Sequence, residues 1–219
     1  MSIGIYFSYW PVMTNARSSP CVLESKSYSL FLCSQEKNVL DNLKTELEKG
    51  EIACFIFEPL VQGAAGMRMY SPEILDKMIA LCHEYGVLCI ADEVMTGFGR
   101  TGKLFATDHC KVKPDFITLS KGLTSGVMAL GLTVTSDKIY NAFLGEETTK
   151  ALLHGHSFTA NPIACAIACA NLDLFEQPLA IQGMKNLEDW NRTFKHQLEK
   201  FEFVKNIRQQ GTIIAFEIE

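Results

Sequence analysis

Short apolar runs that follow helical or crossover segments constrain the fold of this chain more than any other feature. Three such runs cover residues 53–58, 87–91 and 115–119. None alternates apolar with polar residues, a pattern typical of strands buried on both faces of a sheet. The order strand, helix, strand, crossover, strand predicts an α/β fold, with a mostly parallel sheet and helices on both faces.

The helices between these runs are marked by their spacing and their ends. One is expected from Glu36, with Gly50 as its stop, and another from the Ser71–Pro72 cap to Gly86. The expected buried sides are Leu40, Leu43 and Leu47 in the first, and Ile74, Met78, Leu81 and Tyr85 in the second.

The second half of the chain changes character near residue 177. Before it we expect a strand over 129–135, a short helix from Ser136 and a small-residue helix from Asn161 to Phe175. After it we expect an amphipathic helix and two strands, 203–207 and 212–218. The apolar stripe of that helix is Met184, Leu187, Trp190, Phe194, Leu198 and Phe201. Residues 1–176 are therefore interpreted as part of a large domain and 177–219 as part of a smaller one. Within 1–35 only a strand over 6–13 is suggested.

Charge and cysteine placement exclude several classes of protein. The 25 Asp and Glu residues outnumber the 20 Lys and Arg residues, which argues against a nucleic-acid surface. No apolar run approaches the roughly 20 residues of a membrane span, and no signal peptide is recognisable. The eight cysteines form no CxxC pair; Cys54 and Cys89 lie in strand-like runs, and Cys165 and Cys169 share a helical face. Reduced thiols in a cytoplasmic protein are the simpler interpretation.

The glycine pattern at residues 97–102 fits GxGxxG but not the setting of a dinucleotide site. That site needs the glycines directly after a strand and at the start of a helix. Here residues 92–96 intervene, and residues 103–114 show no helical period. We interpret the pattern as a tight loop that shapes the mouth of a site.

Asp92 and Lys121 each follow the end of a predicted buried strand. Carboxyl ends of strands in open α/β sheets are where ligands bind. A lysine amine beside an apolar strand can act as a nucleophile towards carbonyl groups, and a carboxylate nearby can hold a cationic ring nitrogen. Pyridoxal phosphate chemistry needs this pair: a Schiff-base lysine and a pyridinium partner. An ordinary surface acid and a solvated lysine is the alternative.

Residues 154–162 gather His154, His156 and Ser157 just before the Asn161–Pro162 helix start. A metal site is disfavoured because no Asp, Glu or Cys lies nearby to complete it. Hydroxyls and free backbone N–H groups before a helix suit an anion such as phosphate. Simple capping of the helix explains the same residues equally well.

Four segments together resemble one family. They are residues 58–63, 91–102, 119–122 and 154–162, and their order and spacing resemble those of class III pyridoxal-phosphate aminotransferases. The resemblance covers roughly residues 36–219. It implies the large domain of a fold-type I transferase, pyridoxal 5′-phosphate as cofactor, and two-stage transfer of nitrogen from a small-molecule amino donor to a keto acceptor.

The resemblance also implies roles for particular residues. Lys121 would bond to the cofactor aldehyde and move the proton, Asp92 would pair with the pyridinium nitrogen, and Val94 would pack on the ring. His156 and Ser157 would bind the phosphate across the interface of a homodimer. Contacts with the substrate would come from Gly155, and from Glu58 at the substrate entrance, where it can engage an arginine.

Within the class, Met95, residues 66–70 and the 154–157 run resemble the branch that acts in biotin synthesis. That branch transfers an amino group from S-adenosylmethionine to 8-amino-7-oxononanoate, giving 7,8-diaminononanoate. An aminotransferase of the ornithine or 4-aminobutyrate type, or an aminomutase, is the second hypothesis. The third is an inactive fragment, because the family's upstream phosphate loop and ring-stacking aromatic residue, and its downstream carboxylate-binding arginine, have no counterpart here.

Overall fold

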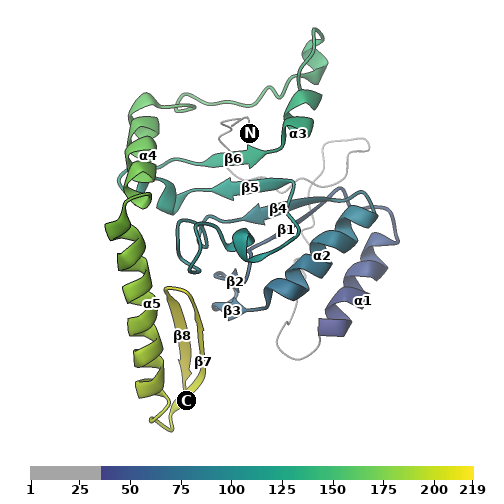
Figure 1. Ribbon diagram of the computed structural model, residues 1–219. Helices are drawn as coiled ribbons and strands as arrows, with labels where there is room; N and C mark the ends of the chain where they lie inside the picture. The colour runs from purple at the N-terminus through teal and green to yellow at the C-terminus, as the bar shows by residue number, and fades with distance from the viewer. Residues whose placement is uncertain (1–35) are drawn as a thin grey trace.

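A central sheet organises the computed structural model, which describes residues 36–219 (Figure 1). Its strands are β1 (Cys54–Phe57), β4 (Leu88–Asp92), β5 (Phe116–Leu119) and β6 (Leu132–Thr135), in the order β1-β4-β5-β6. The first three are parallel and β6 is antiparallel. The predicted mostly parallel sheet is confirmed; the strand suggested over 6–13 lies outside the described residues.

Two helices, α1 (Glu36–Leu47) and α2 (Pro72–Glu84), pack together and bury one side of this sheet. Ser71 caps α2 as predicted: its hydroxyl accepts a hydrogen bond from the Ile74 N–H at 3.3 Å. The buried stripe of α2 is Ile74, Leu75, Met78, Ile79 and Cys82. The prediction that Tyr85 lines this side is wrong, because Tyr85 follows the helix as its C-cap and is 38% exposed.

Burial alternates along β4. Cys89 and Ala91 are buried against the helices, whereas Leu88 is 40% exposed and Ile90 is half-buried. Ile56 of β1 is exposed as well. The expectation that these strands are buried on both faces is therefore wrong within residues 36–219: the runs are apolar at every position, but α1 and α2 cover only one face.

Short elements collect at the carboxyl end of the sheet. A small antiparallel ladder joins β2 (Val61–Gln62) to β3 (Arg68–Met69). Two 3₁₀ turns come after the long strands: η1 (Ala106–His109) after the β4 loop and η2 (Lys121–Thr124) directly after β5. These turns place polar residues at one edge of the sheet, where the sequence predicts the site.

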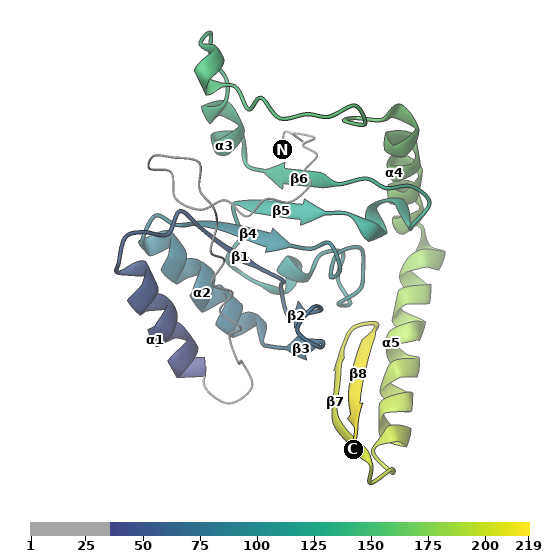
Figure 2. The ribbon, with the colours of Figure 1, turned by 180° about the vertical axis from the view of Figure 1, so that it is seen from behind.

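Beyond β6 the chain makes a long excursion. After α3 (Asp137–Ala142), the segment 143–161, which includes η3 (Thr148–Lys150), runs along the outer side of β6 to α4 (Pro162–Phe175) in both ribbon views (Figures 1 and 2). The predicted start of α4 is confirmed: Asn161 Oδ1 accepts hydrogen bonds from the Ile163 and Ala164 N–H groups at 3.0 and 3.2 Å.

The last elements are the helix α5 (Pro178–Leu198) and an antiparallel hairpin of β7 (Val204–Gln210) and β8 (Ile213–Ile218). The helix lies beside the hairpin. The predicted helix and strands are confirmed. The apolar stripe of α5 is only partly covered: Leu198 is buried, but Trp190 is 71% exposed. Among the described helices, none alone is long and apolar enough to cross a membrane; α4 and α5 pass that test only as a pair bent by 72°.

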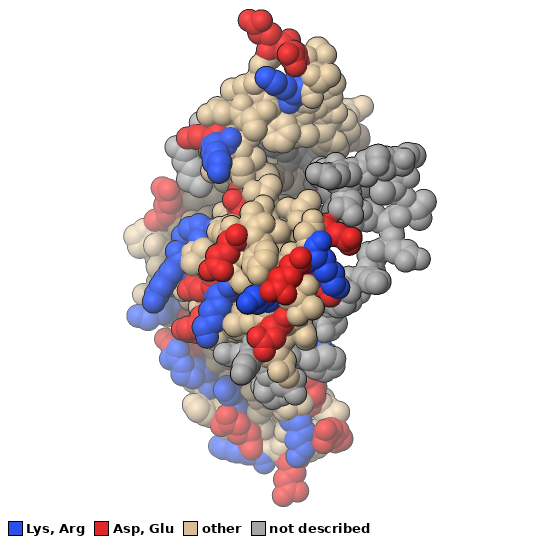
Figure 3. Space-filling model, turned by 90° about the vertical axis from the view of Figure 1, so that its right-hand side faces the viewer, with Lys and Arg blue, Asp and Glu red and all other residues tan. Residues whose placement is uncertain are grey.

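The surface over α1 and α2 carries positive and negative side chains in close alternation (Figure 3). Several are paired along the helices, such as Lys49 with Glu46 at 2.7 Å. Such exposed pairs contribute little stability, about 0–1 kcal/mol each. This face is an ordinary solvated surface with no large field of one sign.

The described cysteines are all free, but they differ in burial. Cys82, Cys89 and Cys110 are buried, as the reduced-thiol interpretation expects. Cys169 is exposed on α4, so burial, unlike the free thiol state, holds for only part of the described set. The remaining two, Cys21 and Cys33, lie outside the described residues.

Candidate active site

Adjacent parallel strands bring the two main candidate residues to one edge. Asp92, the last residue of β4, is in register with Thr118 of β5. Lys121 lies two residues after β5 and opens η2. Parallel strands end at the same edge of a sheet, so the predicted grouping of Asp92 and Lys121 at this edge follows directly from the register.

Lys121 is held in a strained backbone conformation. Its φ is +34°, a region that side chains other than glycine rarely adopt. The next residue, Gly122, has no room for a side chain, because an added Cβ would lie 2.7 Å from the Phe98 ring. Such strain persists only where surrounding structure imposes it, and it clusters at functional sites. Here it directs an exposed lysine into a cavity.

That cavity, of about 510 Å³, lies between the sheet edge, α5 and the start of β8. Lys121, Val94, Gly97 and Arg100 line it together with polar Asn191 and Thr212 and apolar Met67, Met95, Leu187, Ile213 and Ile214. Among the described lining residues, Lys121 and Arg100 are the cations. Arg100 was not among the site residues predicted from the sequence. The sequence feature that could have identified it is its position inside the glycine loop, which was interpreted as the mouth of a site.

Asp92 and Val94 belong to one tight turn. The Val94 N–H donates to Asp92 Oδ1 at 3.0 Å, which fixes the carboxylate relative to the backbone beyond it. Val94 is half-buried and lines the cavity, whereas Asp92 is half-buried and is not among the described lining residues. The hydrogen bond therefore ties the Asp92 carboxylate to a residue that lines the cavity.

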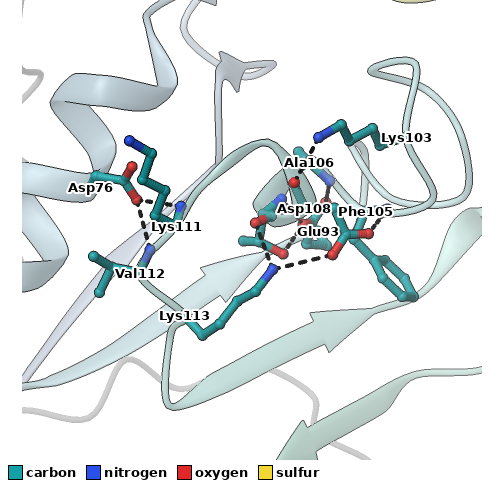
Figure 4. A network of polar contacts seen from close by, with 10 residues as sticks. Asp76, Glu93, Lys103, Phe105, Ala106, Asp108, Lys111, Val112 and Lys113 are labelled. Atoms are coloured by element: carbon teal, nitrogen blue, oxygen red, sulfur yellow. Dashed lines mark hydrogen bonds and ion pairs between the residues drawn. The ribbon is translucent and has the colours of Figure 1, made fainter.

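Glu93, between them, is a buried acid that was not predicted from the sequence to belong to the site. Its side chain is fully buried, and its two carboxylate oxygens accept four hydrogen bonds from Thr96, Ala106 and Thr107. Figure 4 shows Glu93 directed at the backbone of η1. No sequence signal separates Glu93 from Asp92, because both lie at a strand end; only the loop that returns at Ala106 distinguishes them.

The glycine loop takes the role expected of it. Gly97 and Arg100 line the cavity, and the first helical element after Gly102 is the four-residue turn η1, not a long helix. The dinucleotide interpretation is thus disfavoured by the structure as well. Gly99 and Gly102 have φ values of +84° and +93°, which explains the need for glycine at both.

Glu58 is not among the described residues that line the cavity. Its carboxylate accepts a hydrogen bond from the Gly63 N–H at 2.8 Å, and its backbone carbonyl accepts one from the Tyr70 hydroxyl at 2.6 Å. Burial raises the pKa of Tyr70 well above its ordinary value, so this hydroxyl remains a donor. A side chain at Gly63 would collide with Met95, which lines the cavity, so Glu58 supports the turn behind that residue.

The residues expected to bind phosphate, His156 and Ser157, and the expected substrate contact, Gly155, lie elsewhere. Gly155, His156 and Ser157 are exposed in the segment 143–161, on the outer side of β6. They form a local turn in which the His156 N–H donates to Thr159 Oγ1 at 2.8 Å. Among the described residues they do not line the cavity with Lys121. The chain therefore does not unite the two groups within itself.

One described group has the chemistry of a cation site. His83, Cys89 and Asp115 each offer a donor atom within 4.8 Å of the others. Asp115 Oδ2 already accepts from the Cys89 N–H at 2.7 Å and pairs with His83 Nε2 at 3.0 Å. The hydrogen bonds that Asp115 makes at the start of β4 account for this arrangement.

Comparison with known proteins agrees with this geometry. The profile of the class III aminotransferase family matches residues 11–219. The adenosylmethionine-8-amino-7-oxononanoate aminotransferase of Helicobacter pylori is 41% identical over 83% of this chain and 43% of its own length. That of Synechococcus elongatus is 44% identical over 70% of this chain and 36% of its own length. The chain thus spans less than half the length of these relatives.

Solved structures give the same result. Adenosylmethionine-8-amino-7-oxononanoate aminotransferase from Methanocaldococcus jannaschii is 37% identical with a TM-score of 0.78, covering 84% of this chain and 43% of that one. Plasmodium falciparum ornithine delta-aminotransferase is 34% identical with a TM-score of 0.72, covering 82% and 46%. Ornithine aminotransferase from Toxoplasma gondii, with PLP at partial occupancy in its active site, is 30% identical with a TM-score of 0.72, covering 82% and 41%. The resemblance found in the sequence is confirmed, and the chain belongs to the class III aminotransferase family.

Proposed function

We propose that this chain forms the lysine-bearing part of a pyridoxal 5′-phosphate-dependent aminotransferase. The proposed reaction is transfer of an amino group from S-adenosylmethionine to 8-amino-7-oxononanoate, giving 7,8-diaminononanoate for biotin synthesis. The observation that carries the proposal is the position of Lys121 and Asp92 at the ends of adjacent parallel strands beside one cavity.

The donor set suits the cofactor. The cavity is lined by an exposed amine, Lys121, and by the apolar Val94, whose N–H donates to the Asp92 carboxylate. When bound, pyridoxal phosphate supplies an aldehyde for the amine and a protonated ring that withdraws electrons from the substrate. An amine, a fixed carboxylate and an apolar side chain are the groups that these parts of the cofactor require.

Each residue then has one task. Lys121 would hold the cofactor through its amine and, as a base, would move a proton at the substrate carbon. Asp92, oriented by the Val94 N–H, would keep the ring nitrogen protonated. Val94 would provide apolar contact for the ring.

The remaining cavity walls favour a long aliphatic substrate with a carboxylate. Met67, Met95 and Leu187 provide apolar surface for a methylene chain. Arg100 provides a guanidinium, which binds carboxylates through two parallel hydrogen bonds. We assign Arg100 to the carboxylate of the oxononanoate; Glu58 remains proposed for the substrate entrance.

A homodimer completes the proposed site. Gly155, His156 and Ser157 are assigned to the substrate and phosphate of the partner's cavity, because they are exposed and do not line their own. Exposed apolar residues around them support an interface here: Leu153 is 84% exposed, Phe158 73% and Ile163 61%. Exposed apolar surface of this kind marks interaction sites.

The proposal also covers domains and location. The β7–β8 hairpin forms a sheet separate from β1-β4-β5-β6, and α5 bends by 72° from α4. These features support the division into residues 1–176 and 177–219. Free buried thiols such as Cys82 and Cys89 support a reducing cytoplasmic location.

An ornithine-type activity is the second candidate, because ornithine aminotransferases are among the solved structures that this chain resembles. Purified chain is incubated with cofactor, 8-amino-7-oxononanoate and either S-adenosylmethionine or ornithine, and the products are separated by mass spectrometry. Formation of 7,8-diaminononanoate from S-adenosylmethionine is expected. Amino transfer from ornithine alone overturns the biotin assignment, and failure to bind cofactor leaves the inactive-fragment hypothesis.

A further inference from the structure

We propose that Glu93 is a positioning residue whose buried carboxylate sets the turn that presents Asp92 and Val94 to the cofactor. The proposal rests on the proposed function for the identity of that cofactor. Glu93 itself does not line the cavity, so it acts through its neighbours and not by contact.

The carboxylate of Glu93 is saturated by hydrogen-bond donors. Oε1 accepts from the Thr107 N–H at 2.8 Å and from the Thr107 hydroxyl at 2.9 Å. Oε2 accepts from the Ala106 N–H at 3.0 Å and from the Thr96 hydroxyl at 2.7 Å. All of these residues are buried, so no water competes for the donors.

The backbone around Glu93 is fixed at the same time. Its N–H donates to the Thr118 carbonyl at 3.0 Å, which extends the β4–β5 pairing, and its carbonyl accepts from the Gly97 N–H at 2.9 Å. The Val94 N–H is held by Asp92. Residues 92–97 therefore form a closed turn, and the Glu93 side chain joins that turn to η1 behind it (Figure 4).

The arrangement divides the turn into two sides. Val94 and Gly97 line the cavity, and Glu93 and Thr96 are buried on the other side with η1. No residue of η1 is among the described residues that line the cavity. η1 therefore serves as a fixed support, and Glu93 is the link through which it holds the reactive side of the turn in place.

Two acceptor oxygens facing four donors cannot be replaced by an amide. In Glu93→Gln, one oxygen becomes an NH₂ group that must face a buried donor, either the Ala106 or the Thr107 N–H. The turn must shift to relieve that clash. A loss of about one such bond corresponds to roughly ten-fold weaker cofactor binding.

The test compares Glu93→Gln with a control that has the same chemistry elsewhere. Asp76 of α2 also accepts two backbone N–H bonds, from Lys111 and Val112 at 2.9 Å each, but lies away from the cavity. Asp76→Ala therefore reports the effect of losing loop bonds alone. Thr96→Val and Thr107→Val remove one hydroxyl donor each, keep the carboxylate, and serve if Glu93→Gln does not fold.

Two quantities are measured on the full chain: the dissociation constant of pyridoxal phosphate, from absorbance titration, and hydrogen exchange of residues 92–104, from mass spectrometry without cofactor. The expected result is about ten-fold weaker binding and faster exchange in Glu93→Gln. Smaller changes of the same kind are expected in the threonine variants, and neither change in Asp76→Ala.

Each outcome decides the matter. If the wild type binds the cofactor and Glu93→Gln binds it with the same affinity, the positioning role is overturned and the proposed function remains intact. If Glu93→Gln does not fold, unchanged affinity in both threonine variants has the same meaning. Equal weakening by Asp76→Ala shows a general loss of stability and also overturns it. If the wild-type chain binds no cofactor, the proposed function fails for this chain, and unchanged exchange at residues 92–104 then refutes the role of Glu93 independently.

Discussion

The turn at residues 92–107 and the segment 143–161 differ in how completely each satisfies its own contacts. In the turn, Glu93, Thr96 and Thr107 are at most 1% exposed, and hydrogen bonds join them to one another. In the segment 143–161, Leu153 and Phe158 are 84% and 73% exposed. The described residues 36–219 satisfy the contacts of the first region, but they leave apolar side chains of the second region exposed.

This difference assigns the two regions different requirements. The turn carries the proposed ring-nitrogen chemistry beside Lys121, and its geometry depends on contacts that this chain supplies. The segment 143–161 carries the proposed phosphate ligands, His156 and Ser157, and leaves its apolar side chains uncovered by the described residues. We therefore expect variants in the first region to act within one chain, and variants in the second to act through a partner copy.

The largest effect is expected from Lys121→Ala. Removing the amine removes the atom that bonds to the cofactor aldehyde, so both the visible absorbance of the bound cofactor and the turnover should disappear. Borohydride reduction followed by mass spectrometry should locate the cofactor on Lys121 in the wild type. Lys77→Ala, an exposed lysine on α2, is the control and should retain both properties. A reduced adduct that persists in Lys121→Ala contradicts the assignment.

Asp92→Asn should come next, with turnover falling roughly 10²- to 10³-fold. The amide can still accept from the Val94 N–H, so the turn should keep its shape, but it cannot stabilise a charged ring nitrogen. Stopped-flow measurement of each half-reaction tests this. Unchanged rates with an unchanged cofactor spectrum would show that Asp92 is not the ring partner.

The sequence predicts the first region well because its signals are local. Strand ends, a lysine after β5 and a glycine loop can all be read along the chain, and the structure places the lysine and the loop beside one cavity. Glu93 and Arg100 were missed for a physical reason. Their surroundings are made by loops that return from Ala106 and from Thr212, and such contacts leave no periodic pattern near the residues themselves.

The sequence predicts burial in the second half poorly. Spacing identifies α5 as amphipathic, but it cannot say what covers the apolar stripe, and Trp190 proves to be exposed. The same holds for β4, where an apolar run is covered on only one face by α1 and α2. Periodicity reports which side of an element is apolar; which other element packs there is determined by tertiary structure.

Arg100→Ala tests whether the turn at residues 92–107 also binds the substrate at the cavity mouth. Loss of a charge-assisted bond to the substrate carboxylate should raise the KM for the acceptor about 10- to 100-fold, with little change in cofactor affinity. Arg192→Ala, on the surface of α5, is the matched control. Steady-state kinetics with acceptor as the varied substrate separates the two. An unchanged KM removes Arg100 from the proposed substrate site.

Ser157→Ala should weaken cofactor binding about 5- to 10-fold, the effect of one lost hydrogen bond to phosphate. A stronger test of a shared site mixes the Ser157→Ala variant with the Lys121→Ala variant. A mixed dimer contains one cavity with an intact lysine and an intact partner serine, so activity should exceed that of either variant alone. Ser136→Ala, whose hydroxyl makes no cap bond, is the control. Failure of the mixture to recover activity contradicts a site shared between copies.

The smallest effect concerns pH and His109, which supports the first region by contacting the Thr101 carbonyl at 3.0 Å. Burial, assisted by Lys103, lowers the pKa of His109 below its ordinary value near 6.5. The unfolded chain therefore takes up a proton more readily than the folded chain, and stability should fall as the pH drops through about 6.5. Because His109 is partly exposed, the loss should stay below about 1 kcal/mol.

In urea unfolding between roughly pH 7 and pH 5, His109→Asn should lose less stability than the wild type. His196→Asn, on exposed α5, should behave as the wild type does; if His109→Asn does so too, the histidine does not couple this region to pH.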